Sequence, residues 1–147
     1  MIKVSKMADY SVVILSCFVA GTIGQIWSAN DISNKTHLPL PTVAKILKLL
    51  VKGNVLNSHR GVQGGYSLEK YSDEVTVYDI VKSIDGPIAL TACVDNGDDC
   101  SSQPICPMSG GWDSLNSKIR QSFEEVTLRD IASPVDFITG YDNKDNI

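Results

Sequence analysis

The stretch SANDISNKTHLPLPTVAKILKLLVKGNVLNSHRGVQGGYSL, residues 28–68, decides the fold. Ser28 can cap a short helix over residues 29–35, because its hydroxyl can accept a hydrogen bond from a free amide of the first turn. The break HLPLP follows, and a further helix fits from about Pro41, a good first helical residue, to Lys52, where Gly53 is a natural stop. A short helix, a tight break and a second helix with outward lysines follow one another in the order of a helix-turn-helix.

The end of the same stretch, VLNSHRGVQGGYSL, predicts two short strands around a glycine-rich turn. The run RGVQGG cannot be held in a strand, but it suits the tip of a hairpin. A hairpin directly after the second helix of a helix-turn-helix is a wing. The expected fold class is therefore mainly α, a winged helix-turn-helix with a small β-hairpin wing.

Three further helices are expected outside this stretch. Ser5 can cap one that ends near Ala20, and Thr76 can cap another over residues 77–84. A long helix over residues 111–125 carries one apolar stripe with spacings of three and four. The stripe consists of Trp112, Leu115, Ile119, Phe123 and Val126.

This long helix has little of its own domain to pack against, so a second subunit is its expected partner, and two-fold dimers are the commonest oligomers. The alternative is that it folds back on its own domain. The expected organisation is a winged helix-turn-helix domain over residues 1–86, a cysteine loop over 87–110, a dimerisation helix over 111–132 and a flexible tail over 133–147.

The charge of the chain is divided between its two halves. The net charge is −4, but residues 1–72 hold eight Lys or Arg against three Asp or Glu, and residues 73–147 hold five against fourteen. A basic front half is expected where one end of a protein meets phosphate, so the division favours nucleic acid as a partner. Random segregation of charge on a solvated surface is the plainer alternative.

The beginning of the chain predicts a helix and not an export signal. Its apolar run carries Asp9 near the front and lacks a small-residue cleavage site. The run is also too short, with ends too polar, to span a bilayer, so no membrane partner is expected. A cytoplasmic protein follows, in which thiols stay reduced and clustered cysteines indicate metal or redox chemistry before structural disulfides.

The run LTACVDNGDDCSSQPICPM, residues 90–108, places three thiols on a loop. A structural zinc site usually uses closer cysteine pairs and four protein ligands. A disulfide switch would be slowed by the neighbouring acids, which raise thiol pKa values. Inert loop cysteines are the third interpretation. An iron–sulfur cluster, which thiolates hold through loops of this kind, is the fourth.

The chain resembles a known protein family from about Lys3 to Asp130. The telling runs are LPTVAKILKLL, SHRGVQGGYSL, DGPIALTAC and the three-cysteine loop followed by a Trp. In these the chain resembles the iron–sulfur-sensing winged-helix transcriptional regulators (the Rrf-two family) that include IscR, NsrR and SufR. It is most similar to the SufR-type branch, regulators of cluster-assembly genes in proteobacteria.

The resemblance implies ligands for a cluster, either [2Fe-2S] or [4Fe-4S]. Cys93, Cys100 and Cys106 match the three loop cysteines of the family, whereas Ser109 stands where the IscR branch has a ligand His. Asp9 instead matches the carboxylate that NsrR-type members present from the partner subunit. Its alternative interpretation is an acid in the first turn of a helix, favoured there by the helix dipole. Cys17, on an apolar face in mid-helix, is expected in the core.

DNA contacts are expected from the second helix of the helix-turn-helix and from the wing. Thr42 and Lys45 can reach base edges, while Lys48 is expected at phosphate. The resemblance implies that Arg60 enters the minor groove. The remaining expected contacts are Lys6, Tyr10, Pro41, His59, Gln63 and Gly64.

The expected function is therefore a homodimeric repressor that binds a palindromic operator in double-stranded DNA. Its cluster state would control DNA binding, and its targets would be cluster-assembly genes. Attack on the cluster by nitric oxide or an oxidant is an alternative signal for the same fold. A protein-interaction module without a cluster is a further alternative. A thiol enzyme is not expected, because His37 and His59 lie far along the chain from the loop.

Overall fold

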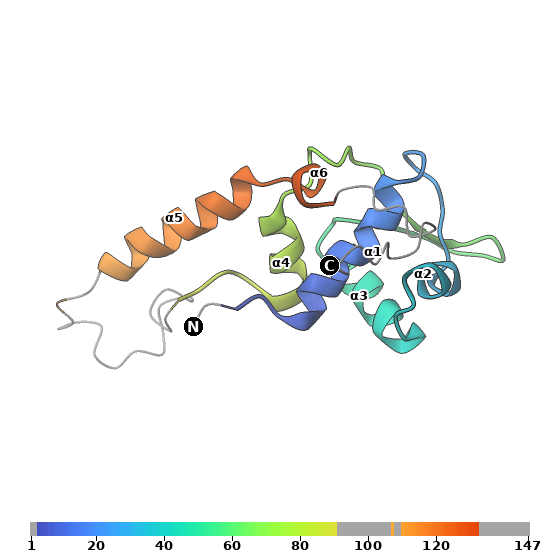
Figure 1. Ribbon diagram of the computed structural model, residues 1–147, viewed down its shortest axis with the longest axis horizontal. Helices are drawn as coiled ribbons and strands as arrows, with labels where there is room; N and C mark the ends of the chain where they lie inside the picture. The colour runs from blue at the N-terminus through green and yellow to red at the C-terminus, as the bar shows by residue number, and fades with distance from the viewer. Residues whose placement is uncertain (1–2, 91–106, 108–109, 133–147) are drawn as a thin grey trace, which may run out of the picture.

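The structure is a computed structural model that describes residues 3–90, 107 and 110–132 (Figure 1). A helical body carries a two-stranded wing, and α5 leaves the body as an extended arm. The predicted fold class, a mainly α winged helix-turn-helix, is confirmed. The elements are α1 (Lys6–Val19), α2 (Ala29–Thr36), α3 (Leu40–Lys52), β1 (Asn57–His59), β2 (Gly65–Ser67), α4 (Val77–Asp85), α5 (Gly111–Glu125) and α6 (Leu128–Ile131).

The predicted helix caps are confirmed. The side chains of Ser5, Ser28 and Thr76 each accept a hydrogen bond from a backbone amide in the first turn of their helix. At Ser28 and Thr76 an Asp three residues on completes a capping box, which satisfies two amides that the helix itself leaves free. Helix α3 begins at Leu40, so Pro41 is its second residue and not its first.

The core lies where α1 packs against α2, α3, α4 and α6. Ile14 and Leu15 of α1 meet Ile46, Leu47 and Leu50 of α3, and all five side chains are fully buried. Each such side chain contributes about 1.5–3 kcal/mol by leaving water. This burial fixes one face of α3 against the body and leaves its polar face to solvent.

The wing is an antiparallel hairpin that a residue before α2 extends. Asn57 pairs with Ser67 and His59 with Gly65. Trp27 and Tyr66 exchange backbone hydrogen bonds of 2.8 Å, so the residue before α2 forms an antiparallel bridge to β2 and extends the sheet by one residue pair. A Cβ atom at Gly65 would collide with the Trp27 carbonyl, which explains the glycine there. The wing is thereby fixed relative to the helix-turn-helix.

The predicted helix over residues 111–125 is confirmed as α5, and the expected dimerisation region, residues 111–132, also contains the short helix α6. Helix α5 ends at Glu125, and Val126 and Thr127 are extended. Thr127 pairs with Thr76 in an antiparallel bridge, in which Val77 N–H donates to the Val126 carbonyl over 2.8 Å. Thr127 then caps the short α6. This bridge holds the end of α5 beside the beginning of α4.

Among the helices of the part of the chain that the structure describes, none has both the length and the apolar character that crossing a bilayer requires.

Candidate functional site

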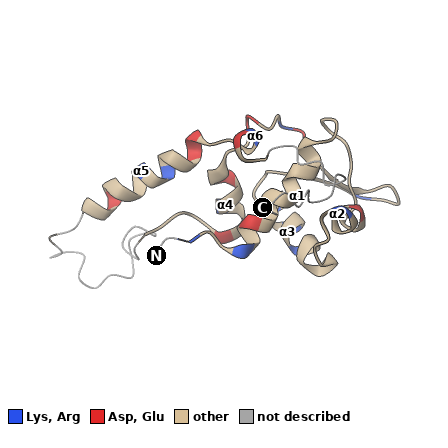
Figure 2. Ribbon diagram, in the orientation of Figure 1, with Lys and Arg blue, Asp and Glu red and all other residues tan. Residues whose placement is uncertain are grey.

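The helix-turn-helix and wing form a surface of positive charge. Residues 32–68 contain Lys35, Lys45, Lys48, Lys52 and Arg60 and no acid. Lys45 and Lys48 are both exposed and lie three residues apart, so they share one side of α3. The charges can be followed along the ribbon in Figure 2. Such a concentration of cations attracts a polyanion, and we call residues 32–68 the basic segment.

The front of α3 presents small and apolar groups beside these lysines. Pro41 is exposed, Thr42 is half-buried, and Leu40 is 41% exposed. The predicted contacts Pro41, Thr42, Lys45 and Lys48 therefore lie along one exposed helix. A helix of this kind fits the major groove of DNA, where Thr and Lys can meet base edges or phosphate.

The tip of the wing projects from the molecule. Arg60 and Gln63 are exposed, and Val62 between them is fully exposed. Gly61 has φ +110°, which lets the chain turn at the tip. His59 behaves differently from its neighbours, because its Nε2 lies 2.7 Å from Ser67 Oγ on the opposite strand. The ring of His59 thus bends back along the hairpin, while Arg60 and Gln63 reach outward.

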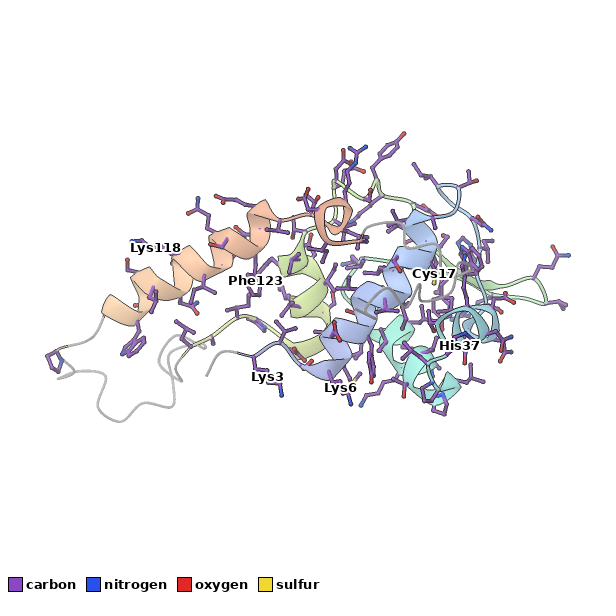
Figure 3. All side chains as sticks on the ribbon, in the orientation of Figure 1. Lys3, Lys6, Cys17, His37, Lys118 and Phe123 are labelled. Carbon is purple, nitrogen blue, oxygen red and sulfur yellow. The ribbon has the colours of Figure 1, made fainter. Side chains whose placement is uncertain are left out.

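Lys6 and Tyr10 lie on the first turns of α1. Lys6 is exposed, and its Nζ lies 5.9 Å from the centre of the Tyr10 ring. Tyr10 is half-buried and packs against the core. Figure 3 shows Lys3 and Lys6 together near the beginning of α1. Two cations therefore flank the beginning of this helix.

Asp9 lies on the same stretch of α1 at the edge of a groove. The groove has a volume of about 650 Å³ and a mostly apolar floor that includes Val12, Ile80 and Ile131. Asp9 is exposed, and among residues 3–90, 107 and 110–132 no group forms a hydrogen bond or ion pair with its carboxylate. The exposure of the carboxylate is compatible with both interpretations of Asp9.

The three loop cysteines, Cys93, Cys100 and Cys106, lie outside the described residues. Cys17 is fully buried, and its Sγ lies 3.9 Å from the Val13 carbonyl. Burial raises the pKa of the Cys17 thiol, although Lys35 partly offsets the effect. A buried, protonated thiol is a poor metal ligand, so Cys17 belongs to the core, as predicted. Across the part of the chain that is described, no cluster of metal-ligating side chains is found.

The apolar stripe of α5 divides into two parts. Trp112 and Leu115 are 40% and 44% exposed. Ile119 and Phe123 are half-buried, and they line a cavity together with Val81 of α4. Figure 3 shows Phe123 reaching from α5 toward α4. The second half of α5 thus packs on its own domain, while the first half leaves its apolar residues in solvent.

The fold and the basic segment define a winged helix-turn-helix DNA-binding regulator. The family model described as an iron-dependent transcriptional regulator, Rrf2, matches residues 4–134, and the chain belongs to this family. The family consists of transcriptional regulators and not of enzymes.

Relatives and solved structures agree with this assignment. An HTH-type transcriptional regulator of Mycobacterium tuberculosis (strain H37Rv) is 29% identical over 88% of this chain and 81% of that protein. The regulator IscR of Sodalis glossinidius is 25% identical over 79% of this chain and 70% of its own. CymR, the global cysteine regulator of B. subtilis, has a TM-score of 0.67 at 23% identity, covering 92% of this chain and 100% of that one. IscR of T. potens has a TM-score of 0.61 at 23% identity, covering 95% and 93%. These two structures show the fold.

Two features of the site gave no signal in the sequence analysis. Val62 is an ordinary turn residue by sequence, and only the structure shows that its side chain is fully exposed at the tip of the wing. Asn116 reads as a solvated residue between two apolar positions of α5. In the structure it is buried, and its amide forms hydrogen bonds with residues 88 and 90.

Proposed function

We propose that the protein is a homodimeric repressor that binds a palindromic operator through the basic segment. In this proposal α3 enters the major groove, with Thr42 and Lys45 toward base edges and Lys48 toward phosphate. Arg60 enters the adjacent minor groove from the wing. The observation that best supports DNA binding is the positive charge of residues 32–68, which contain no acidic residue. These residues form a helix-turn-helix and a hairpin that the pairing of Trp27 with Tyr66 fixes to one another.

Dimerisation through α5 is supported by apolar surface on both sides of the expected contact. Trp112 and Leu115 are exposed on the first half of α5. The groove beside Asp9 offers an apolar floor to a second copy of the chain. Contiguous exposed apolar surface is typical of protein interaction sites. A partner's α5 in this groove would bring the partner's cysteine loop toward Asp9.

The proposed signal is the iron–sulfur cluster status of the cell. Cys93, Cys100 and Cys106 would bind the cluster, with Asp9 of the other subunit as fourth ligand. Thiolates are the usual ligands of iron–sulfur clusters, and the exposed carboxylate of Asp9 supports its role as the fourth ligand. A bound cluster supplies a group that oxidation or loss of iron removes. With the cluster bound, the cysteine loop of one subunit and Asp9 of the other would be joined. Without it, they would separate. The expected target genes are those for cluster assembly.

Joining or separating the cysteine loop and Asp9 of the other subunit would alter DNA binding for a geometric reason. The two recognition helices of a dimer must enter major grooves about 34 Å apart. A small displacement of one subunit relative to the other therefore costs much affinity. Nitric oxide or an oxidant would act through the same link and is the alternative signal. A protein-interaction module without a cluster is the alternative from another class.

The experiment is a comparison of apo and holo protein by fluorescence anisotropy, on an operator obtained by selection from random duplexes. The proposal expects the operator to be retained over a scrambled duplex, with different affinities for apo and holo protein. The triple variant of the loop cysteines is the matched control and should bind as apo protein does under all conditions. Equal, weak affinity for both duplexes would favour the interaction module. Equal affinities of apo and holo protein for the operator would remove the sensing role.

A further inference from the structure

The segment that leads from α4 into the cysteine loop is attached to α5 by one side chain. Asn116 Nδ2 donates a hydrogen bond of 3.0 Å to the Ile88 carbonyl, and Leu90 N–H donates one of 3.2 Å to Asn116 Oδ1. The two bonds use both ends of the amide, so they fix the orientation of the side chain as well as its position. Asn116 is 8% exposed, and it is the buried residue of α5.

The packing of this segment against α5 leaves a cavity. Its volume is about 320 Å³, and it is lined by Gly86, Ile88 and Leu90 of the segment and by Ile119 and Phe123 of α5. Gly86 has φ +86°, a conformation that ends α4 and directs the chain toward α5. Since the apolar contacts across the cavity are incomplete, the two hydrogen bonds of Asn116 define the register between the segment and α5.

The other end of the segment is attached to α1. Ser5 Oγ donates a hydrogen bond of 2.7 Å to Asp85 Oδ1 at the last residue of α4. A continuous set of contacts therefore leads from the beginning of α1, where Asp9 lies, through residues 85–90 to Asn116 of α5. Coupling between sites requires a contiguous physical connection of this kind together with an element that changes position.

We infer that Asn116 is a positioning residue that links the entrance of the cysteine loop to α5, so that a change in the loop moves α5 relative to the winged-helix domain. The inference rests on the proposed function, because it takes the cluster loop as the origin of the change. It assigns to α5 a role in transmitting the signal in addition to its expected role in dimerisation. Removing the link should leave the fold and the dimer intact while separating cluster state from DNA affinity.

The test uses Asn116→Asp, which has nearly the same shape but lacks the donor to the Ile88 carbonyl. Ser117→Asp is the matched control, because it places the same charge on the neighbouring exposed position. Hydrogen exchange of residues 86–90 is measured in the apo protein by mass spectrometry. The Asp carboxylate can still accept from Leu90 N–H, but it repels the Ile88 carbonyl to which Asn116 donates, so the segment should open more often. The protection of the Leu90 amide should therefore fall by about tenfold in Asn116→Asp at about pH 8 and stay as in the wild type in Ser117→Asp.

Acid gives a second readout that a general loss of structure would not produce. Burial raises the pKa of a carboxyl group, and once protonated the group can donate a hydrogen bond again, so Asn116→Asp should recover protection as the pH falls from about 8 toward about 4. Lys3 and Asp85 also line the cavity, so the wild type is measured in parallel to remove any effect of their titration. Absence of this recovery, or equal protection in wild type and variant, would overturn the inference.

The functional readout is the ratio of apo to holo affinity for the selected operator. In Asn116→Asp this ratio should move toward one at about pH 8, with an unchanged dimer mass and an unchanged cluster spectrum. Loss of Leu90 protection with an unchanged ratio would overturn the inference, because Asn116 would then be structural only. A wild type that binds no cluster would contradict the proposed function. The exchange experiment would still decide whether Asn116 fixes the segment.

Discussion

Ser5 and Asp85 are separated by 80 positions in the sequence, and the Ser5 hydroxyl donates a hydrogen bond of 2.7 Å to Asp85 Oδ1. The same hydroxyl accepts a hydrogen bond from Ala8 N–H over 3.1 Å. One side chain thus caps α1 and fixes the end of α4 beside it. The beginning of α1, which carries Asp9, is therefore placed relative to the segment that leads to the cysteine loop.

Ser5→Ala should lower the free energy of unfolding by about 1 kcal/mol, since it removes an N-cap. Ser5→Thr keeps the hydroxyl and should remain close to the wild type. Urea denaturation followed by circular dichroism measures both variants. Equal midpoints for wild type and Ser5→Ala would mean that the cap and its bond to Asp85 contribute nothing.

Two capping boxes predict a loss of stability in acid. The Ser28 hydroxyl and amide donate to the Asp31 carboxylate and hold its pKa below the ordinary value. The Thr127 amide and hydroxyl do the same for the pKa of Asp130. A depressed pKa in the folded state gives stability that is present above the unfolded pKa of about 3.9 and is lost as pH falls through the folded pKa.

The double variant Asp31→Asn with Asp130→Asn should therefore show a smaller decrease in stability below about pH 4 than the wild type. Urea midpoints across a series of acid buffers provide the measurement. A slope identical to that of the wild type would show that these carboxylates titrate alike in the folded and unfolded chain.

The proposed DNA contacts separate into those that position the protein and those that specify the base sequence. Lys48→Ala should weaken binding to all sequences alike and reduce the slope of log affinity against log salt by about 0.9 per subunit. Lys45→Ala, if Lys45 reads a guanine, should cost about 1–3 kcal/mol on the operator and relax preference at one position per half-site. Anisotropy with operator and scrambled duplexes across a salt series distinguishes the two. Wild-type behaviour of both variants would reduce the basic segment to a solvated surface.

Arg60→Ala should reduce affinity most on operators with a narrow minor groove, because such a groove concentrates negative potential around an inserted cation. Val62→Ala, at the same tip and fully exposed, is the control for general disturbance of the wing. Duplexes that differ only in an A-tract beside the recognised bases supply the comparison. An equal loss on both duplexes would place Arg60 at phosphate and not inside the groove.

Asp9→Ala should keep the fold, because the side chain is exposed, but it should make the cluster labile by leaving an open coordination site. Asp9→Cys should retain a cluster. The rate at which visible absorption decays in air measures lability, with Lys6→Ala as a control on the same turn. An unchanged spectrum and lifetime in Asp9→Ala would return Asp9 to its alternative role as an acid at a helix N-terminus.

The sequence predicted those parts of the fold that local chemistry decides. Ser5, Ser28 and Thr76 were predicted as caps, because a hydroxyl before an apolar periodic run is a local signal. The wing was predicted from its glycines for the same reason. Helix α6 was not predicted, although Thr127 and Asp130 form the same capping box as Thr76 and Asp79, because four residues give no periodicity.

The features that sequence analysis missed depend on contacts between distant residues. The bridge between Trp27 and Tyr66, the bond from Ser5 to Asp85 and the two bonds of Asn116 each join separate elements. Nothing in the local composition distinguishes an Asn that is buried and hydrogen-bonded to a distant segment from a solvated one. Residue type and position led to the proposed DNA contacts, which stay predictions, but they gave no sign of the inward turn of His59 onto Ser67.

The central claim is that Cys93, Cys100 and Cys106 hold an iron–sulfur cluster in a dimer of this chain. Anaerobic native mass spectrometry, combined with the absorption spectrum of the same sample, tests it most directly. We expect a dimer whose mass exceeds that of two polypeptides by iron and sulfide, with visible thiolate-to-iron absorption. We further expect a colourless dimer of bare polypeptide mass for the variant with all three cysteines changed to Ala. A wild type that carries only zinc or no metal, or a triple variant that still carries iron and sulfide in stoichiometric amount, would contradict the claim.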